Sequence, residues 1–146
     1  MSRGLWPRPP GEDILGMDPM KHHAQGWINV IRFESKPYDE VEGLSIAEVH
    51  VVEEFSGDFD GTGTVRFVMV TQPDGSNHFT GMERFVGRLG EFSGSFVMRN
   101  SGLLKDGAVN SEWMVVPGTG TGALRGLRGV GGCRSAEGVF LDYWFE

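Results

Sequence analysis

The chain has a single cysteine, Cys133, among 146 residues. One thiol cannot form a disulfide within the chain, and it cannot supply the several ligands of a cysteine-rich zinc or iron–sulfur site. Basic residues are also scarce, since 13 Lys and Arg stand against 20 Asp and Glu and give a formal net charge of −7. This balance argues against a nucleic acid as the main partner, because binding a phosphate backbone needs a basic surface.

Long hydrophobic runs are missing as well. No stretch reaches the roughly 18 apolar residues that a membrane-spanning helix needs, and the first residues lack the apolar core of a secretory signal. We therefore expect a cytoplasmic protein with no membrane partner. The length suits one main domain, and 39% hydrophobic residues suffice for its core.

Glycine is abundant instead, with 23 residues that separate apolar stretches without a three-residue period. From residue 24 onward, β-branched and aromatic runs alternate with turn residues, which is typical of an antiparallel all-β domain. The Lys36-Pro37-Tyr38-Asp39 and Pro73-Asp74-Gly75-Ser76 segments are two such predicted turns. The pattern predicts eight strands, at about 25–33, 44–55, 62–71, 77–86, 93–101, 108–116, 126–133 and 139–145.

Eight strands at this spacing can close into an antiparallel β-barrel, which removes exposed sheet edges and can leave room for one small ligand. A two-sheet sandwich is the alternative architecture. Residues 1–23 contain four prolines and no periodic apolar pattern, so we expect an irregular N-terminal extension before a domain at 24–146. The functional alternative for this extension is a lid that lays Trp6 or Leu15 over a pocket.

Several short motifs occur in a fixed order: Lys36–Glu40, Phe55–Asp58, Gln72–Ser76, Gly81–Arg84, Gly94–Val97, Val115–Gly122, Leu124–Gly132 and Leu141–Tyr143. In this order they resemble the DUF3224 family of bacterial proteins over about residues 26–146. The resemblance implies an eight-stranded barrel like that of allene oxide cyclase. Barrels of that type include cofactor-independent isomerases and cyclases of polyene, polyketide or epoxide-like substrates. One departure is Arg99-Asn100-Ser101-Gly102, where family members commonly read Gln-His-x-Gly.

Glu83 is the first candidate catalytic residue. Side chains alternate across a strand, so Glu83 shares a face with Phe79 and Phe85, and Arg84 shares the other with Met82. A carboxyl group inside a barrel would have a raised pKa and could act as a general acid or base. A cross-strand ion pair near the rim is the alternative.

The other catalytic candidates are polar residues in later or neighbouring strands. Asn100 or Arg99 could polarise a substrate carbonyl, although a buried amide bonded to backbone is the alternative for Asn100. His50 shares a face with Glu48 and could form an acid–base couple, with a surface histidine as the alternative. Asp142 lies between aromatic residues on one face, which suits either a pocket or an interface.

Aromatic and apolar residues offer walls for a ligand, although such residues fill protein cores more often. The candidates for substrate binding are Trp27, Phe79, Phe96, Met98, Trp113, Tyr143 and Trp144. We predict no metal, because adjacent imidazoles such as His22-His23 in a leader segment usually bind none and Asp58-Phe59-Asp60 lacks the distal Glu of a calcium loop. We predict no cofactor, because the glycine-rich Gly118–Ala123 segment is not followed by the helix of a dinucleotide site.

These observations lead to three functional hypotheses. The first is a cofactor-independent isomerase or cyclase that folds an apolar substrate inside the barrel. The second is a protein that binds an apolar metabolite without changing it, and the third is a structural protein whose barrel is filled by side chains. Hydrophobic positions on both faces of several strands also predict a homodimer.

Overall fold

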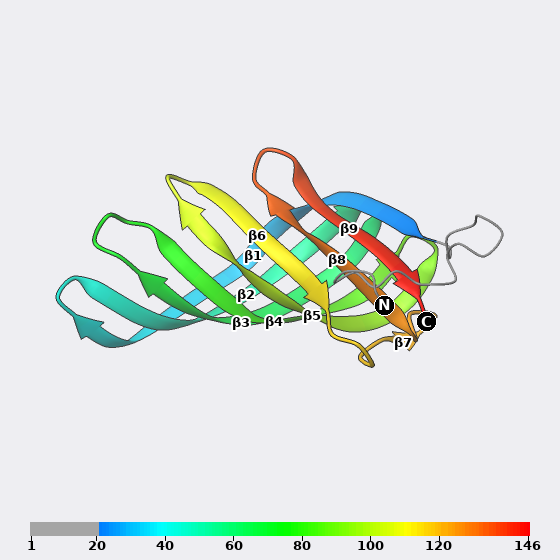
Figure 1. Cartoon of the computed structure of the whole chain (residues 1–146), viewed down its shortest axis with the longest axis horizontal. Coiled ribbons are helices and arrows are strands. Elements are labelled where there is room, and N and C mark those ends of the chain that lie inside the picture. The colour runs from blue at the N-terminus through cyan, green and yellow to red at the C-terminus, as the bar shows by residue number, and fades with distance from the viewer. Residues whose placement is uncertain (1–20) are drawn as a thin grey trace, which may run out of the picture.

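The computed structural model describes residues 21–146, which fold into a single antiparallel sheet with no helix in that range (Figure 1). No segment of this range therefore forms a helix long and apolar enough to cross a membrane. Strands β1 to β9 are His22–Val41, Leu44–Gly57, Phe59–Thr71, Asn77–Leu89, Phe92–Lys105, Ala108–Val115, Thr121–Gly122, Leu127–Arg134 and Gly138–Phe145.

The strands form a ring of hydrogen-bonded neighbours. Their order is β4-β3-β2-β1-β9-β8-β6-β5, and β5 pairs in turn with β4. The short strand β7 adds to β5 through two residue pairs. The prediction of an antiparallel all-β domain is confirmed. The described residues form nine strands and not the predicted eight, because the glycine-rich sequence gave no indication of the short β7.

The predicted end of the first strand is wrong. The turn expected at residues 36–39 lies inside β1, and the chain reverses at Glu42 and Gly43, both of which have positive φ. Strand β1 pairs with β9 only from His22 to Gly26, so its remainder has a neighbour on one side alone among the described strands. An edge strand tolerates Pro37, which lacks an N–H donor, and a register shift between Pro37 and Asp39 accommodates it.

Strand β1 begins two residues before residue 24, where the sequence predicted the domain to start. His22 and His23 belong to β1, where they pair with Tyr143 and Asp142 of β9. The His22 ring stacks on Tyr143 at 4.8 Å between centroids. The predicted lid, with Trp6 or Leu15, lies outside the described residues.

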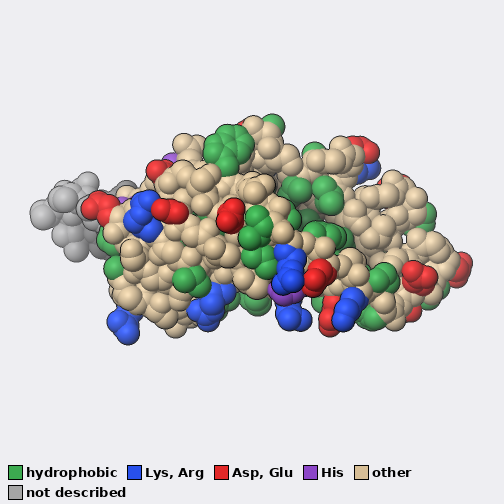
Figure 2. Space-filling model, turned by 180° about the vertical axis from the view of Figure 1, so that it is seen from behind, with side chains coloured by type: hydrophobic (Ala, Val, Ile, Leu, Met, Phe, Trp, Pro, Cys, Tyr) green, Lys and Arg blue, Asp and Glu red, His purple; other side chains and the backbone are tan. Residues whose placement is uncertain are grey.

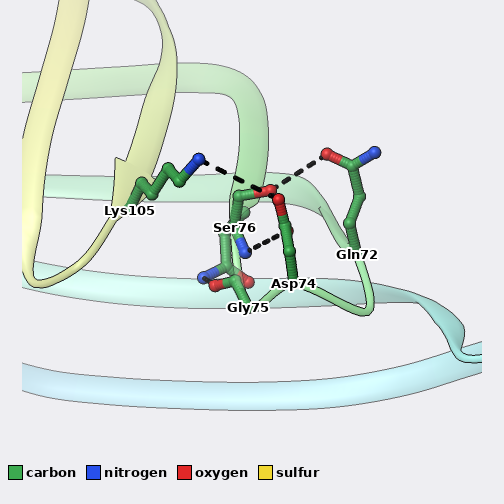
Figure 3. Close-up of polar contacts among 6 residues, drawn as sticks. Gln72, Asp74, Gly75, Ser76 and Lys105 are labelled. Carbon is green, nitrogen blue, oxygen red and sulfur yellow. Dashed lines mark hydrogen bonds and ion pairs between the residues drawn. The ribbon is translucent and has the colours of Figure 1, made fainter.

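The turn between β3 and β4 is held by its own side chains, and here the sequence prediction is confirmed (Figure 3). Ser76 Oγ lies 2.6 Å from Oδ1 of Asp74 and 3.0 Å from Oε1 of Gln72, and the Ser76 backbone N–H also donates to Asp74. These hydrogen bonds from Ser76 lower the pKa of Asp74. Lys105 Nζ, 4.0 Å from Asp74, links the next hairpin to this turn.

The interior is filled more completely at one end of the ring than at the other. Aromatic rings pack around Phe85, which lies edge to face with Phe55 at 5.2 Å between centroids and is tilted against Phe96 at 5.3 Å. A second, smaller cluster of Ala47, Val49, Val51 and Val65 lies on β2 and β3. The hairpin tips end at different heights, with the β1–β2 tip reaching furthest (Figure 1). Val30 and Phe33 of β1 consequently stay half exposed.

Candidate functional site

Glu83 is buried in the interior with 0% of its surface exposed. Strand β4 alternates as the sequence predicted, so Arg84 is exposed on the outside. Glu83 makes no ion pair with any described residue. The carboxyl group, and not the guanidinium, is therefore the charge-bearing group that β4 brings into an apolar setting.

A second carboxyl group, that of Glu53, meets Glu83 in the interior. Glu53 lies on β2, is 7% exposed, and is close enough to Glu83 for the two side chains to share a hydrogen bond when one of them carries a proton. Our sequence reasoning missed Glu53, although the signal was present. It shares the alternation of Val51 and Phe55, whereas its neighbour Glu54 is exposed.

Gly63 of β3 provides the room in which these carboxyl groups meet. Its backbone pairs with Glu53 on β2 and with Phe85 on β4. A Cβ atom added at Gly63 would collide with Oε2 of Glu83 and would stand 2.8 Å from the Phe55 ring. The absence of a side chain here therefore allows the Glu83 carboxyl to occupy the space above β3.

The two carboxyl groups hold their protons more tightly than exposed glutamates do. Burial raises the pKa of Glu83 well above its usual value, and the charge and hydrogen bond of Glu53 raise it further. A hydrogen bond from Asn100 Nδ2 to Oε1 of Glu83, 3.1 Å long, acts in the opposite direction. Burial also raises the pKa of Glu53, and its hydrogen bond with Glu83 partly offsets this rise.

One shared proton satisfies this pair. With both groups ionised, Oε2 of Glu83 would be buried without a donor. A protonated Glu83 can donate to the Glu53 carboxylate, which removes both the unpaired oxygen and the repulsion of like charges. The geometry therefore favours a neutral Glu83 beside an ionised Glu53.

Glu53 and Asn100 line a mainly apolar pocket of about 300 Å³. The pocket lies between the inner faces of strands from opposite sides of the ring. Its apolar walls include Phe33, Phe67, Met69, Phe79, Leu104 and Val109. A carboxyl group that can exchange protons thus borders a space that suits a small apolar molecule.

The predicted substrate-binding residues fall into two groups. Trp27, Phe79 and Trp113 line the pocket. The others lie elsewhere, because Phe96, Met98 and Tyr143 belong to the packed core and Trp144 lies on the opposite face of β9. The pocket residues that the sequence did not single out are Ile28, Val30, Phe33, Val51, Glu53, Phe67, Met69, Leu104, Val109, Ser111, Cys133, Ser135 and Gly138.

Three predicted catalytic residues do not reach the pocket. Arg99 is exposed on the outer face, with Nη2 3.5 Å from Met114 Sδ. Asp142 lies on the same outer face, 2.6 Å from His23 Nδ1. His50 also points outward, and its nearest acid is Glu34, at 3.8 Å, and not the predicted Glu48. Only Glu83 and Asn100 among the five predicted catalytic residues come together.

Cys133 belongs to the pocket wall. Burial, followed by the nearby Glu53 carboxylate, raises the pKa of its thiol to about 11, so the thiol stays protonated at neutral pH. Two polar atoms of other wall residues are buried without a hydrogen-bond partner, namely Asn100 Oδ1 and Trp113 Nε1. Within residues 21–146, no three His, Cys, Asp or Glu side chains gather as metal ligands would.

Comparison with known proteins places this sheet in a family. The family model described as "Protein of unknown function (DUF3224)" matches residues 24–146. The chain belongs to the DUF3224 family. The DUF3224 structure of a protein with unknown function from Shewanella oneidensis MR-1 is similar, with a TM-score of 0.65 and 23% sequence identity. The likeness covers 87% of this chain and 97% of that one, and at this identity it concerns the fold alone. None of the curated proteins matches the chain.

Proposed function

We propose that this DUF3224 protein is a cofactor-independent isomerase or cyclase that acts on an apolar small molecule in the pocket beside Glu53. The observation that carries the proposal is the buried Glu53–Glu83 pair at the wall of an apolar pocket. A carboxylate with a raised pKa is a stronger base than an exposed one, and an apolar site strengthens that effect.

In the proposed reaction, Glu53 takes a proton from a carbon next to a substrate carbonyl. The electron pair of that C–H bond moves toward the carbonyl oxygen, and Glu53 then returns the proton to a different carbon. No atom is gained or lost, so the product is an isomer. Glu83 keeps its own proton and positions Glu53 by donating a hydrogen bond, while Asn100 holds Glu83 in place.

The two unpaired atoms in the pocket wall would suit a substrate that carries a carbonyl group, a hydroxyl group or both. The Trp113 indole N–H can donate only, so it would suit a carbonyl oxygen on which negative charge develops. Asn100 Oδ1 can accept only, so it would suit a hydroxyl group. The remaining walls offer dispersion contacts to a hydrocarbon skeleton.

The family resemblance extends the proposal to fold type and substrate class. We propose that the ring of strands is a closed barrel of the allene oxide cyclase type. Its supporting observation is the pairing of β4 with β5, which joins the two ends of the strand order. Polyene, polyketide and epoxide-like intermediates of natural-product pathways are the substrates that this resemblance implies.

A β,γ-unsaturated cyclohexenone tests the reaction, because its conversion to the conjugated ketone is followed by ultraviolet absorbance. We expect the protein to accelerate this conversion over buffer. Glu53→Gln should lower the rate by about 100-fold, since general-base catalysis typically contributes that much. Glu54→Gln is the matched control, because Glu54 is the adjacent acid on the exposed face of the same strand.

Binding of the same ketone, followed by thermal stabilisation, separates catalysis from the alternative of a metabolite-binding protein. Stabilisation without acceleration would favour a non-catalytic binder. Neither stabilisation nor acceleration, or equal rates for Glu53→Gln and Glu54→Gln, would contradict the proposed function.

A further inference from the structure

The outer face of the sheet carries a surface in which arginines alternate with apolar side chains. One row runs across four neighbouring strands, with Arg66, Met82, Arg99 and Met114 paired in sequence. Arg84, on the same face, lies two residues from Met82 along β4. We call the surface formed by Arg66, Met82, Arg84, Val86, Arg99 and Met114 the arginine–methionine patch.

This patch is unusual in a chain with a net charge of −7. Arg66, Arg84 and Arg99 make no ion pair with any described carboxylate; Arg84 instead donates to Ser95 Oγ, and Arg99 to a sulfur. The apolar members are open to solvent, with 55% of Met82 and 53% of Val86 exposed. A surface that combines basic and apolar groups is suited to bind a partner surface that is both acidic and apolar.

The β1–β2 hairpin tip has the complementary composition. Residues 38–44 read Tyr-Asp-Glu-Val-Glu-Gly-Leu, and their three acids form no ion pair within the described chain. Tyr38 and Val41 are 60% and 54% exposed. In Figure 2 this end of the molecule, at the far right, shows acidic side chains beside hydrophobic ones. We call residues 38–44 the acidic tip.

The tip of a chain cannot reach the patch of that same chain. Both belong to one continuous sheet, in which His50 of β2 is the residue paired with Arg66. From Leu44 to His50 the strand rises by roughly 20 Å, at about 3.3 Å per residue. The two surfaces are therefore held apart, and their complementarity can be used only between molecules.

We propose that the acidic tip of one molecule binds the arginine–methionine patch of a second copy of this chain. The contact pairs the carboxylates of Asp39, Glu40 and Glu42 with the unpaired arginines, and it covers exposed apolar surface on both sides. It does not involve the pocket beside Glu53, so it stands independently of the proposed function.

Charge reversal on either surface tests the contact, with sedimentation velocity as the measurement. The patch variant combines Arg66→Glu, Arg84→Glu and Arg99→Glu, and the tip variant combines Asp39→Lys, Glu40→Lys and Glu42→Lys. We expect the unaltered protein to associate with rising concentration and to dissociate as salt rises from about 0.05 M to about 0.5 M. Each variant alone should lose at least tenfold in association.

A mixture of the two variants is the decisive sample. The tip variant has a basic tip and a basic patch, and the patch variant has an acidic tip and an acidic patch, so only unlike molecules attract. Association should therefore return in the mixture. Arg125→Glu and Glu137→Lys, exposed in turns outside both surfaces, are matched controls that should associate normally. Circular dichroism verifies folding, and a patch variant with Gln in place of Glu provides a milder second test.

Three results would overturn the inference. The first is an unaltered protein that stays monomeric at all concentrations. The second is a patch or tip variant that associates as strongly as the unaltered protein. The third is a mixture that remains monomeric although each variant is folded, because direct contact between tip and patch requires the complementary pair to bind.

Discussion

Glu83 keeps its proton because burial removes water from the carboxyl group and the protein supplies too few hydrogen-bond donors to stabilise the ionised form. Its side chain is fully buried, its one hydrogen-bond donor among residues 21–146 is Asn100 Nδ2, and a second carboxyl group lies beside it. Each of these conditions is set by a different strand, namely β4, β5 and β2. The acid–base property of the site thus arises from three residues that are distant in sequence.

The raised pKa of Glu83 makes stability depend on pH in a defined direction. Between the pKa of an unfolded glutamate and the higher pKa in the folded chain, the folded state binds more protons, so stability falls as pH rises. Glu83→Gln resembles the protonated group and should remove this loss. Its unfolding free energy, relative to that of the unaltered protein, should therefore improve as the pH rises above the ordinary pKa of glutamate, by at most about 1.4 kcal/mol per pH unit.

Urea denaturation at several pH values measures this difference. Glu54→Gln is the control, and its effect should not change in the same way because Glu54 is exposed. A constant difference between Glu83→Gln and the unaltered protein across the whole range would show that Glu83 titrates as an ordinary glutamate.

For individual residues, the sequence predicted Glu83 and Asn100 of the central cluster but not Glu53. Alternation along the strands placed Glu83 and Asn100 on apolar faces. The same rule places Glu53, which alternates with Val51 and Phe55, on the buried face of its strand. The sequence does not show that Glu53 meets Glu83 across Gly63, because that contact joins three strands. For Arg99, His50 and Asp142 the rule gave the face, and only the three-dimensional structure shows that this face is the outside.

Strand β1 behaves as two elements joined end to end. Its first five residues, His22–Gly26, pair with β9, and its residues from Gly26 onward pair with β2. Among the strands of residues 21–146, the part from Trp27 to Val41 therefore borders β2 alone. In an antiparallel pair, alternate residues direct their N–H groups toward the same neighbour. About every second amide from Trp27 to Val41 therefore has no partner strand within the part of the chain that the structure describes.

Hydrogen exchange followed by NMR should reveal this alternation. We expect amides of β1 beyond Gly26 that face away from β2 to exchange rapidly, and their immediate neighbours to be protected. Strand β2 is the internal control, because it lies between β1 and β3 and should be protected throughout. Uniform protection along β1 would contradict the edge assignment.

The sequence predicted this element only in part. Pro37 and the polar residues around it resemble a turn, and local chemistry alone would end the strand there. The strand continues because the pairing of Glu40 with Ser45 and of Val41 with Leu44 extends the hairpin beyond the proline. That pairing depends on the neighbouring strand, which a local pattern does not contain.

For the whole molecule, the seam between β1 and β9 completes the ring. It consists of five residue pairs, which join His22–Gly26 to Val139–Tyr143. Leu141, at its centre, is 0% exposed and belongs to the main core cluster. The sequence predicted both strands. Their pairing was not predicted, because it joins residues near the two ends of the chain and no local pattern indicates such a contact.

Leu141→Ala should therefore destabilise the entire fold. We expect a loss of about 2 to 5 kcal/mol in unfolding free energy, as for other buried leucines. Tryptophan fluorescence and far-ultraviolet circular dichroism should report the same transition, because the ring unfolds as one unit. Asp142→Asn, its exposed neighbour, is the control and should cost less than about 1 kcal/mol. A loss below about 1 kcal/mol for Leu141→Ala would show that the seam contributes little.

The residue at position 63 indicates which homologues of this protein can hold a buried carboxyl group at position 83. The missing side chain on β3 and the acid on β4 occupy one shared volume, so neither position can change freely while the other stays. Homologues that retain the acid at position 83 should retain glycine at position 63, and those with a bulkier residue there should have replaced the acid. Joint variation at these two positions would distinguish the family members that have the buried, protonated carboxyl group from those that lack it.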